Sequence, residues 1–265
     1  MTEAANQGTA LITGASSGIG AIYADRLARR GYDLILVARN DTRLNELSSR
    51  LMAETGRSVE TIAADLGDAA DLARIETVLS SDARITLLLN NAGVGATQSL
   101  LESDLGKMQA MIDLNVTALM RLSYAAAPGF VARGAGTIIN IASIVAIAPE
   151  VLNGVYGGTK AFVLAFSQSL RAELADKGVT VQAVLPGATA TDFWEISGRP
   201  IDHLPGEIVM SAADMVDASL AGLDQGEFVT IPALPELADW NAYEAARQAM
   251  MPNLSRATPA PRYLQ

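Results

Sequence analysis

The stretch TALITGASSGIG, residues 9–20, decides the fold of this chain. It begins with a short apolar run, Thr9–Thr13, continues through glycines spaced G-x-x-x-G-x-G, and is followed by helical spacing. A strand that enters a helix through glycines brings backbone N–H groups close to a bound pyrophosphate. Side chains at Gly14, Gly18 and Gly20 would block that approach. An ordinary glycine turn is the alternative, which the strand–turn–helix context disfavours.

Short apolar runs alternate with helical patterns along the rest of the chain. The predicted strands are Thr9–Thr13, Asp33–Val37, Ser58–Ala63, Ile85–Leu89, Thr137–Ile141, Thr180–Leu185 and Glu227–Ile231. The predicted helices are Ile22–Arg30, Arg43–Ala53, Ala70–Leu79, Leu105–Arg133, Val155–Ala175, Ala212–Leu223 and Leu237–Met250. This alternation predicts an α/β fold, a doubly wound, Rossmann-like parallel sheet of seven strands with helices on both faces.

The domain organisation follows from the absence of a long linker in the sequence. We predict a single dinucleotide-binding domain over residues 1–265. Within it, residues 232–265 are expected to form a C-terminal extension packed on the domain or on a neighbouring subunit.

Composition excludes several classes of protein. Half of the 265 residues are hydrophobic and 18% are charged, so disorder is not expected. The net charge of -10 argues against nucleic-acid binding. With no cysteine and one histidine, the chain cannot form disulfides and no metal site is predicted. We see no signal peptide and no apolar run of membrane-spanning length, which predicts a cytoplasmic protein without a membrane partner.

The end of the second predicted strand indicates which dinucleotide would bind. An acidic residue at this point would bind the ribose 2′-hydroxyl of NAD, but Ala38 and Arg39 stand there instead. The Arg39 guanidinium can bind a 2′-phosphate through charge-assisted hydrogen bonds. The sequence therefore favours NADP(H), with NAD(H) bound more weakly. A solvated surface arginine is the alternative.

A phenol and an ammonium four residues apart predict acid–base chemistry. Tyr156 and Lys160 share one face of a predicted helix, and a nearby cation lowers the pKa of a phenol towards neutral pH. Such a phenol is a suitable general acid or base for an alcohol–carbonyl pair. Ser143 ends a predicted strand, where ligands of such sheets lie. Packing of an amphipathic helix face is the alternative for Tyr156 and Lys160.

Taken together, the motifs resemble those of the short-chain dehydrogenase/reductase family, in its compact group with a YxxxK motif. The resemblance covers the chain to about residue 231. It rests on TGASSGIG at 13–20, Asp65-Leu66, Asn90-Asn91-Ala92-Gly93, Asn115, Ser143, YxxxK at 156–160, and Pro186-Gly187 with Thr191. Gly157 and Gly158 depart from the family pattern, because small residues that favour helices better are usual there.

The resemblance implies a role for each matching residue. Tyr156 would donate the proton. Lys160 would lower the pKa of Tyr156 and hold the nicotinamide ribose, and Ser143 would bind the substrate oxygen. Asn115 would bend its helix and hold a water that completes a proton relay. Asp65 and Leu66 would contact the adenine, and Thr191 the carboxamide. The remaining implied cofactor contacts are Gly14, Ser16, Ser17, Gly18, Ile19, Gly20, Arg39, Asn91, Ala92, Gly93, Tyr156, Lys160, Pro186 and Gly187.

Some of these residues have simpler interpretations. Asp65 could cap the following helix, and Asn115 could merely cap or kink its own. Phe193 and Trp194, in a segment expected to shape the substrate pocket, could be core or interface residues.

The predicted protein is an oxidoreductase that transfers hydride between NADP(H) and a mostly apolar ketone, aldehyde or secondary alcohol. Homodimers or homotetramers are usual in the family and are expected here. A protein that binds NADP(H) as a sensor without turnover is the main alternative, and a scaffold with a vestigial glycine turn is a second.

Overall fold

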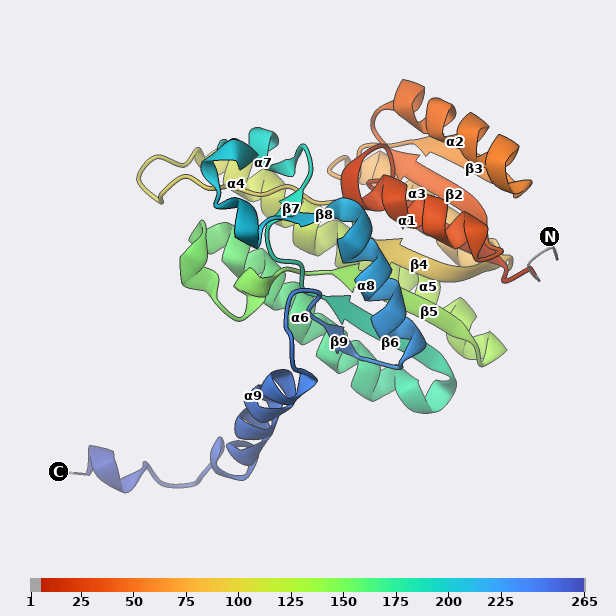
Figure 1. Ribbon diagram of the computed structural model, residues 1–265. Coiled ribbons are helices and arrows are strands. Elements are labelled where there is room, and N and C mark those ends of the chain that lie inside the picture. The colour runs from red at the N-terminus through yellow and green to blue at the C-terminus, as the bar shows by residue number, and fades with distance from the viewer. Residues whose placement is uncertain (1–5, 265) are drawn as a thin grey trace. The chain divides into compact units, whose positions relative to one another are not determined.

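The computed structural model describes residues 6–264, which form two compact units, one ending at Pro232 and the other starting at Ala233. The first unit contains a seven-stranded parallel sheet in the order β3-β2-β1-β4-β5-β6-β9 (Figure 1). Its strands are β1 (Thr9–Thr13), β2 (Asp33–Ala38), β3 (Val59–Ala63), β4 (Ile85–Asn90), β5 (Gly136–Ile141), β6 (Val179–Val184) and β9 (Val229–Thr230). The predicted doubly wound parallel sheet is confirmed.

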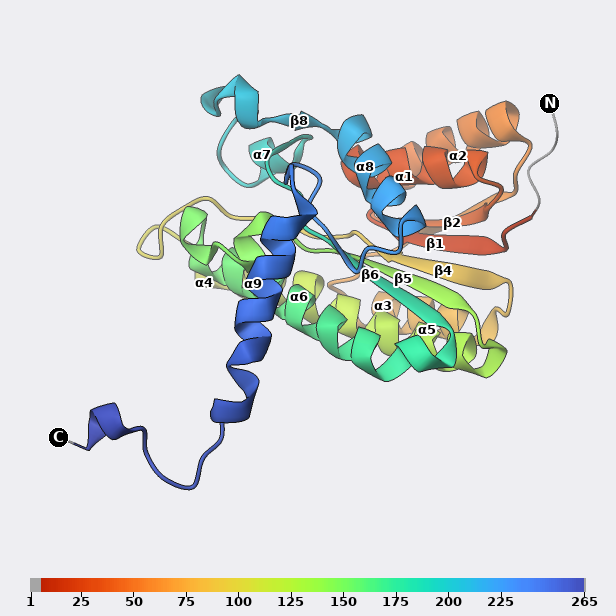
Figure 2. The same cartoon turned by 60° about the horizontal axis from the view of Figure 1, so that its bottom comes forward.

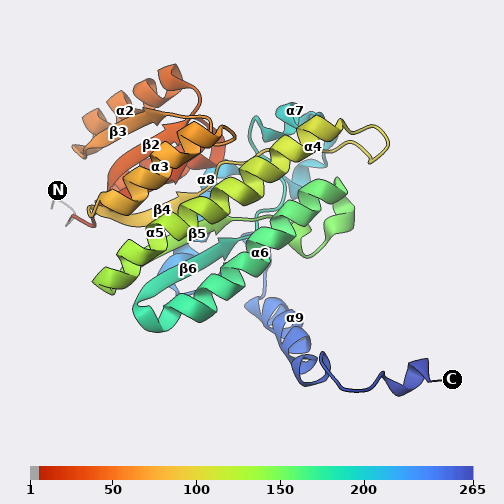
Figure 3. The ribbon, with the colours of Figure 1, turned by 180° about the vertical axis from the view of Figure 1, so that it is seen from behind.

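Helices cover both faces of this sheet. In Figure 2, α1, α2 and α8 lie on one face of the sheet and α3, α5 and α6 on the other. Figure 3, the view from behind Figure 1, has α3, α5 and α6 in front of the sheet. The helices are α1 (Gly18–Arg29), α2 (Asp41–Thr55), α3 (Ala69–Ser81), α4 (Leu105–Ile112), α5 (Leu119–Arg133), α6 (Gly154–Leu174), α7 (Phe193–Ile196), α8 (Ala212–Asp224) and, in the second unit, α9 (Leu237–Ala249).

The two-residue period of the strands divides the core between the two faces. In β1, Ala10 and Ile12 pack in the cluster beneath α1, α2 and α8, whereas Leu11 belongs to the cluster beneath α3, α5 and α6. Leu36 and Val37 divide in the same way in β2. Strands buried on both faces must be apolar throughout, which explains the continuous runs in the sequence.

The strand order reverses direction between β1 and β4. Connections from these neighbouring strands leave towards opposite faces, and a crevice forms beyond their carboxyl ends. The glycine turn follows β1 here, and Asn91 follows β4. The topology therefore brings together two of the motifs that the sequence singled out.

Several elements differ from prediction. The helix predicted over Leu105–Arg133 is not one α-helix, because residues Asp113–Ala118 between α4 and α5 are π-helical. The last strand is shorter than Glu227–Ile231. A second, two-stranded sheet pairs β7 (Thr189–Ala190) with β8 (Met210–Ser211) and was not predicted, because two-residue strands carry no detectable period.

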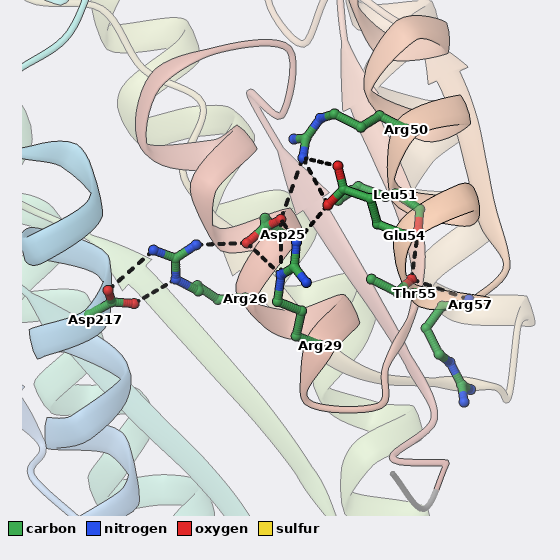
Figure 4. A network of polar contacts seen from close by, with 9 residues as sticks. All are labelled: Asp25, Arg26, Arg29, Arg50, Leu51, Glu54, Thr55, Arg57 and Asp217. Carbon is green, nitrogen blue, oxygen red and sulfur yellow. Dashed lines mark hydrogen bonds and ion pairs between the residues drawn. The ribbon is translucent and has the colours of Figure 1, made fainter. Parts of the chain in front are cut away.

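An ion-pair network fixes α1, the helix behind the glycine turn, to its neighbours (Figure 4). Arg26 bonds Asp25 and, on α8, Asp217, with N–O distances of 2.7 Å to each. Arg50 on α2 lies 3.5 Å from the Asp25 carboxylate. Burial opposes ionisation of Asp25, but hydrogen bonds from Arg29 and Arg26 outweigh it and hold its pKa below the ordinary value.

The second unit contains α9, in which the rings of Trp240 and Tyr243 lie 5.3 Å apart. How residues 232–265 pack stays a prediction. Of the helices within residues 6–264, none is both long enough and apolar enough to cross a membrane.

Candidate active site

The glycine turn connects β1 to α1 in a conformation that requires glycine. Gly14 and Gly18 have φ of 66° and 53°, in the left-handed region that disfavours side chains. A Cβ on Gly20 would lie 2.3 Å from the Gly14 carbonyl oxygen. Backbone conformation at Gly14 and Gly18, and close packing at Gly20, therefore exclude side chains from the turn. All three predicted glycines are needed for it.

Thr13, which the sequence analysis did not single out, joins this turn to the segment after β4. Its hydroxyl accepts hydrogen bonds from the backbone N–H groups of Asn91 and Ala92, both at 3.0 Å. The Asn91 amide in turn donates to the Thr13 and Gly14 carbonyls, at 2.9 and 3.2 Å. In the sequence, Thr13 is the first residue of the TGASSGIG motif and places a hydroxyl at the carboxyl end of a buried strand.

The amino end of α1 fits an anionic ligand. Within residues 6–264, five α-helices begin at a side chain that accepts hydrogen bonds from the first turn: Asn40 for α2, Asp68 for α3, Asp104 for α4, Asn153 for α6 and Ser211 for α8. Among the described residues, no side chain caps α1, and its first turn holds no acidic residue. Its first N–H groups and positive dipole end suit a pyrophosphate, so the donor set fits a dinucleotide.

The segment after β2 presents two guanidinium groups, with one acidic residue, Asp41, between them in the sequence. Arg39 follows the buried Ala38, is exposed, and forms no ion pair within residues 6–264. Arg43, in the first turn of α2, adds a second guanidinium that the sequence analysis did not consider. It lies 3.6 Å from the Asp192 carboxylate, next to Thr191. This end of the sheet can accept a phosphate beyond the pyrophosphate.

Asp65 and Leu66 follow β3, with Leu66 buried and Asp65 exposed. The Asp65 carboxylate accepts a hydrogen bond from the Gly67 N–H at 2.9 Å. It does not cap α3, because Asp68 does so by accepting from Ala70 and Asp71. The helix-cap interpretation of Asp65 is therefore wrong, and adenine contact stays a prediction.

The residues predicted for catalysis come from three elements and are all buried. Tyr156 and Lys160 lie one turn apart on α6, Ser143 follows β5, and Asn115 lies in the π-helical segment. The Lys160 ammonium donates to the Ile141 carbonyl at 2.9 Å and lies 5.8 Å from the centroid of the Tyr156 ring. The Ser143 hydroxyl lies near enough to the Tyr156 phenol to lower the pKa of the phenol, and it donates a hydrogen bond to the Pro186 carbonyl at 3.4 Å.

Asn115 uses its side chain to hold neighbouring segments. Its amide donates to the Val94 carbonyl at 2.8 Å and to the Thr159 hydroxyl at 3.1 Å, and its oxygen accepts from the Val94 N–H at 3.0 Å. These bonds tie the π-helical segment to the connection after β4 and to α6. The helix is irregular at this residue, and π-helical turns often occur at functional sites. The proton relay stays a prediction.

The pKa of Tyr156 differs from the sequence prediction. Burial raises it to about 12, against the effect of the nearby Ser143 hydroxyl, which lowers it. The sequence argument expected a lowered pKa, because residue spacing reveals the neighbouring ammonium but not the depth of burial. A neutral phenol at physiological pH is the form that donates a proton. Burial also lowers the pKa of Lys160, to about 8.

The free energy of unfolding of the wild type should rise between about pH 8 and pH 10, and Lys160→Met should abolish this rise. The folded pKa lies below the ordinary value of 10.5, so the unfolded chain binds more protons in this window. The free energy of unfolding therefore increases with pH, by on the order of 3 kcal/mol in full. Tyr156, whose pKa is raised, contributes with the opposite sign only above about pH 10.

Urea unfolding at several pH values measures this difference between wild type and variant. Exposed Lys177, replaced by Met, is the control and should keep the rise. An identical pH dependence in the wild type and Lys160→Met would contradict a buried ammonium.

The two glycines after Tyr156 have different surroundings. A Cβ on Gly157 would lie 3.0 Å from Cβ of Pro149, so this glycine allows the loop after Ser143 to pack against α6. Gly158 is exposed, and a Cβ added there would meet nothing within 4 Å. Nothing in the structure explains the glycine at 158.

Apolar side chains surround the phenol. Tyr156 belongs to a cluster that includes Val145 and Met111, with Leu152 and Phe193 packed against it. These come from the loop after Ser143, from α4 and from the segment after Thr191. Trp194 is buried, as its core interpretation expected, and its indole N–H donates to the Thr189 carbonyl at 3.0 Å.

Comparison with known proteins identifies the class to which this fold and these residues belong. Residues 8–200 match the family described as short chain dehydrogenase. The chain belongs to the short-chain dehydrogenase/reductase family and is an oxidoreductase.

Individual relatives differ in what they bind and act on. A short-chain dehydrogenase from Sphingobium yanoikuyae, in complex with NADPH, has 50% identity and a TM-score of 0.94, over 97% of this chain and 99% of that one. A bulky-bulky ketone specific alcohol dehydrogenase from Comamonas testosteroni has 46% identity and a TM-score of 0.90, over 98% and 100%. Serine 3-dehydrogenase from Rhizobium radiobacter is 37% identical over 70% of this chain and 74% of its own length.

Proposed function

We propose that this oxidoreductase uses NADPH to reduce apolar ketones and aldehydes, and NADP⁺ to oxidise the corresponding secondary alcohols. The observation that carries the proposal is the buried Tyr156 phenol, which has Ser143 and the Lys160 ammonium near it and apolar side chains packed against its ring. The relatives from Sphingobium yanoikuyae and Comamonas testosteroni, the one bound to NADPH and the other specific for ketones, support both halves of it.

Each protein group has a defined part in ketone reduction. When bound, the dinucleotide supplies the hydride that reaches the carbonyl carbon. Ser143 donates a hydrogen bond to the carbonyl oxygen as negative charge develops there. Tyr156 transfers its proton to that oxygen, so the alcohol leaves neutral and the phenolate is left beside the Lys160 ammonium. The Lys160 ammonium, which the Ile141 carbonyl holds in place, stabilises that phenolate.

The remaining predicted residues would bind the cofactor. The N–H groups at the start of α1, with Ser16, Ser17 and Ile19, would hold the pyrophosphate, and Arg39 the 2′-phosphate. Asp65 and Leu66 would contact the adenine. Asn91, Ala92, Gly93, Pro186, Gly187 and Thr191 would line the nicotinamide half. NAD(H) would bind more weakly, because it lacks the group that Arg39 recognises.

Loss of NADPH absorbance with a panel of carbonyl compounds tests the proposal. We expect turnover with aryl and alkyl ketones and little with hydroxylated, charged aldehydes. NADPH binding without turnover of any compound would favour the sensor alternative. Failure to bind NADPH in a fluorescence titration would favour the scaffold alternative.

We also propose that the chain forms a homodimer or homotetramer through α5 and α6. Tyr124 on α5 is 67% exposed, and its ring lies 6.2 Å from that of Phe166 on α6, which is 5.6 Å from Phe162. An exposed tyrosine beside two half-buried phenylalanines forms an aromatic patch of the kind enriched at interfaces. Sedimentation velocity measures the mass, and a monomer at micromolar concentration would contradict the proposal.

A further inference from the structure

The ring of Phe193 occupies the space that a side chain at residue 95 would need. A Cβ on Gly95 would lie 2.1 Å from Cζ and 2.6 Å from Cε2 of Phe193. The backbone of Gly95 is outside the left-handed region, so alanine is compatible with its conformation. The obstacle to a side chain at Gly95 is therefore the aromatic ring and not the backbone.

The Phe193 ring also packs against the ring of the proposed proton donor. The centroids of the Phe193 and Tyr156 rings are 5.7 Å apart, with the planes tilted by 46°. Phe193 thus contacts both Gly95, in the segment after β4, and the phenol ring on α6. A group bound at the Tyr156 hydroxyl would extend beside this ring.

Two contacts fix α7, which carries Phe193. The adjacent Trp194 is buried, packs edge-on against Phe193 with centroids 5.6 Å apart, and is anchored to Thr189. At the end of α7, the Ser197 carbonyl accepts a hydrogen bond from the Thr97 hydroxyl at 2.9 Å. Because α7 is held at both points, a collision at Gly95 would be relieved by rotating the Phe193 ring towards Tyr156.

We infer that Phe193 and Gly95 form a ring-and-socket pair that determines how large an apolar substituent the ketone can carry. This inference rests on the proposed function. With the ring seated over Gly95, space beside Tyr156 remains for a bulky group that packs against the ring face. A side chain at residue 95 would push the ring into that space, and bulky ketones would lose access before small ones.

A double-mutant cycle with acetophenone and acetone tests this pair. Gly95→Ala should lower the ratio of kcat/KM for acetophenone over acetone by about 10-fold or more. Phe193→Ala removes the ring, so adding Gly95→Ala to it should change the ratio by less than about twofold. Gly206→Ala, where nothing lies within 4 Å of the added carbon, is the control and should match wild type. Equal effects of Gly95→Ala in both backgrounds would overturn the inference.

Thermal unfolding separates this inference from the proposed function. Gly95→Ala should lower the Tm in the wild-type background and not in the Phe193→Ala background, whether or not any ketone is reduced. If wild type reduces ketones but the two substitutions have additive effects on both the kcat/KM ratio and the Tm, the inferred role of Phe193 and Gly95 is wrong and the proposed function stands. If no ketone is reduced but the Tm values are coupled, the contact is real, and the proposed function and the specificity role that rests on it both fail.

Discussion

Tyr156→Phe should lower kcat for ketone reduction by about 10³-fold or more, while the dissociation constant for NADPH changes by less than about threefold. The substitution removes only the hydroxyl that carries the proton. The ring keeps its contacts with Phe193 and with the cluster that includes Val145, so the apolar packing is preserved. With no other donor at that position, the developing alkoxide must take its proton from water or not form.

Stopped-flow or steady-state oxidation of NADPH measures kcat, and fluorescence titration measures binding. Tyr32→Phe is the matched control, because it removes a phenol hydroxyl next to the amino end of β2, away from the carboxyl ends of the strands, and should retain full activity. Full activity in Tyr156→Phe would remove this residue from the mechanism. Binding of NADPH by the wild type without turnover would support the alternative that the protein is a sensor.

Arg39→Ala should weaken NADPH binding by about 10- to 100-fold and leave NADH binding nearly unchanged. The guanidinium is exposed, follows β2 directly and forms no ion pair with any residue from 6 to 264, so its hydrogen bonds are available for a 2′-phosphate. Hydrogen bonds to charged groups contribute about 1.5 to 3 kcal/mol, which corresponds to this range. NADH has no phosphate at that position and loses nothing.

Titration of both cofactors into both proteins measures this selectivity, and the preference for NADPH should decline as salt is added. Arg84→Ala is the control, because Arg84 lies at the amino end of β4, away from the glycine turn. Equal weakening of NADPH binding and NADH binding would show that Arg39 supports the fold and does not bind the 2′-phosphate. A smaller, additional loss is expected for Arg43→Ala, because Arg43 already pairs with Asp192.

The sequence predicts the parts of the fold that depend on local pattern. The buried strands agree with prediction to within a residue or two up to β6, because strands covered on both faces must be apolar along their length. The glycine spacing locates the turn after β1, because few other residues tolerate its backbone conformation. The order of the motifs along the chain is sufficient to identify the family.

Features that depend on contacts distant in sequence could not be predicted. The π-helical segment accompanies bonds between Asn115 and Val94, twenty-one residues apart. The pKa of Tyr156 is set by burial, which residue spacing does not reveal. The role of Thr13 depends on a strand that joins the sheet much later in the chain. Phe193 has no motif of its own, and only the fold places it over Gly95.

The bond between Lys160 and the Ile141 carbonyl has an evolutionary consequence. It anchors the ammonium to the framework of the sheet, whereas the apolar residues that face the phenol belong largely to connecting segments. Mutations in those segments would therefore alter the apolar surface beside the phenol and leave Tyr156 and Lys160 in place. One scaffold can in this way diversify into enzymes as different as a ketone-specific alcohol dehydrogenase and a serine 3-dehydrogenase.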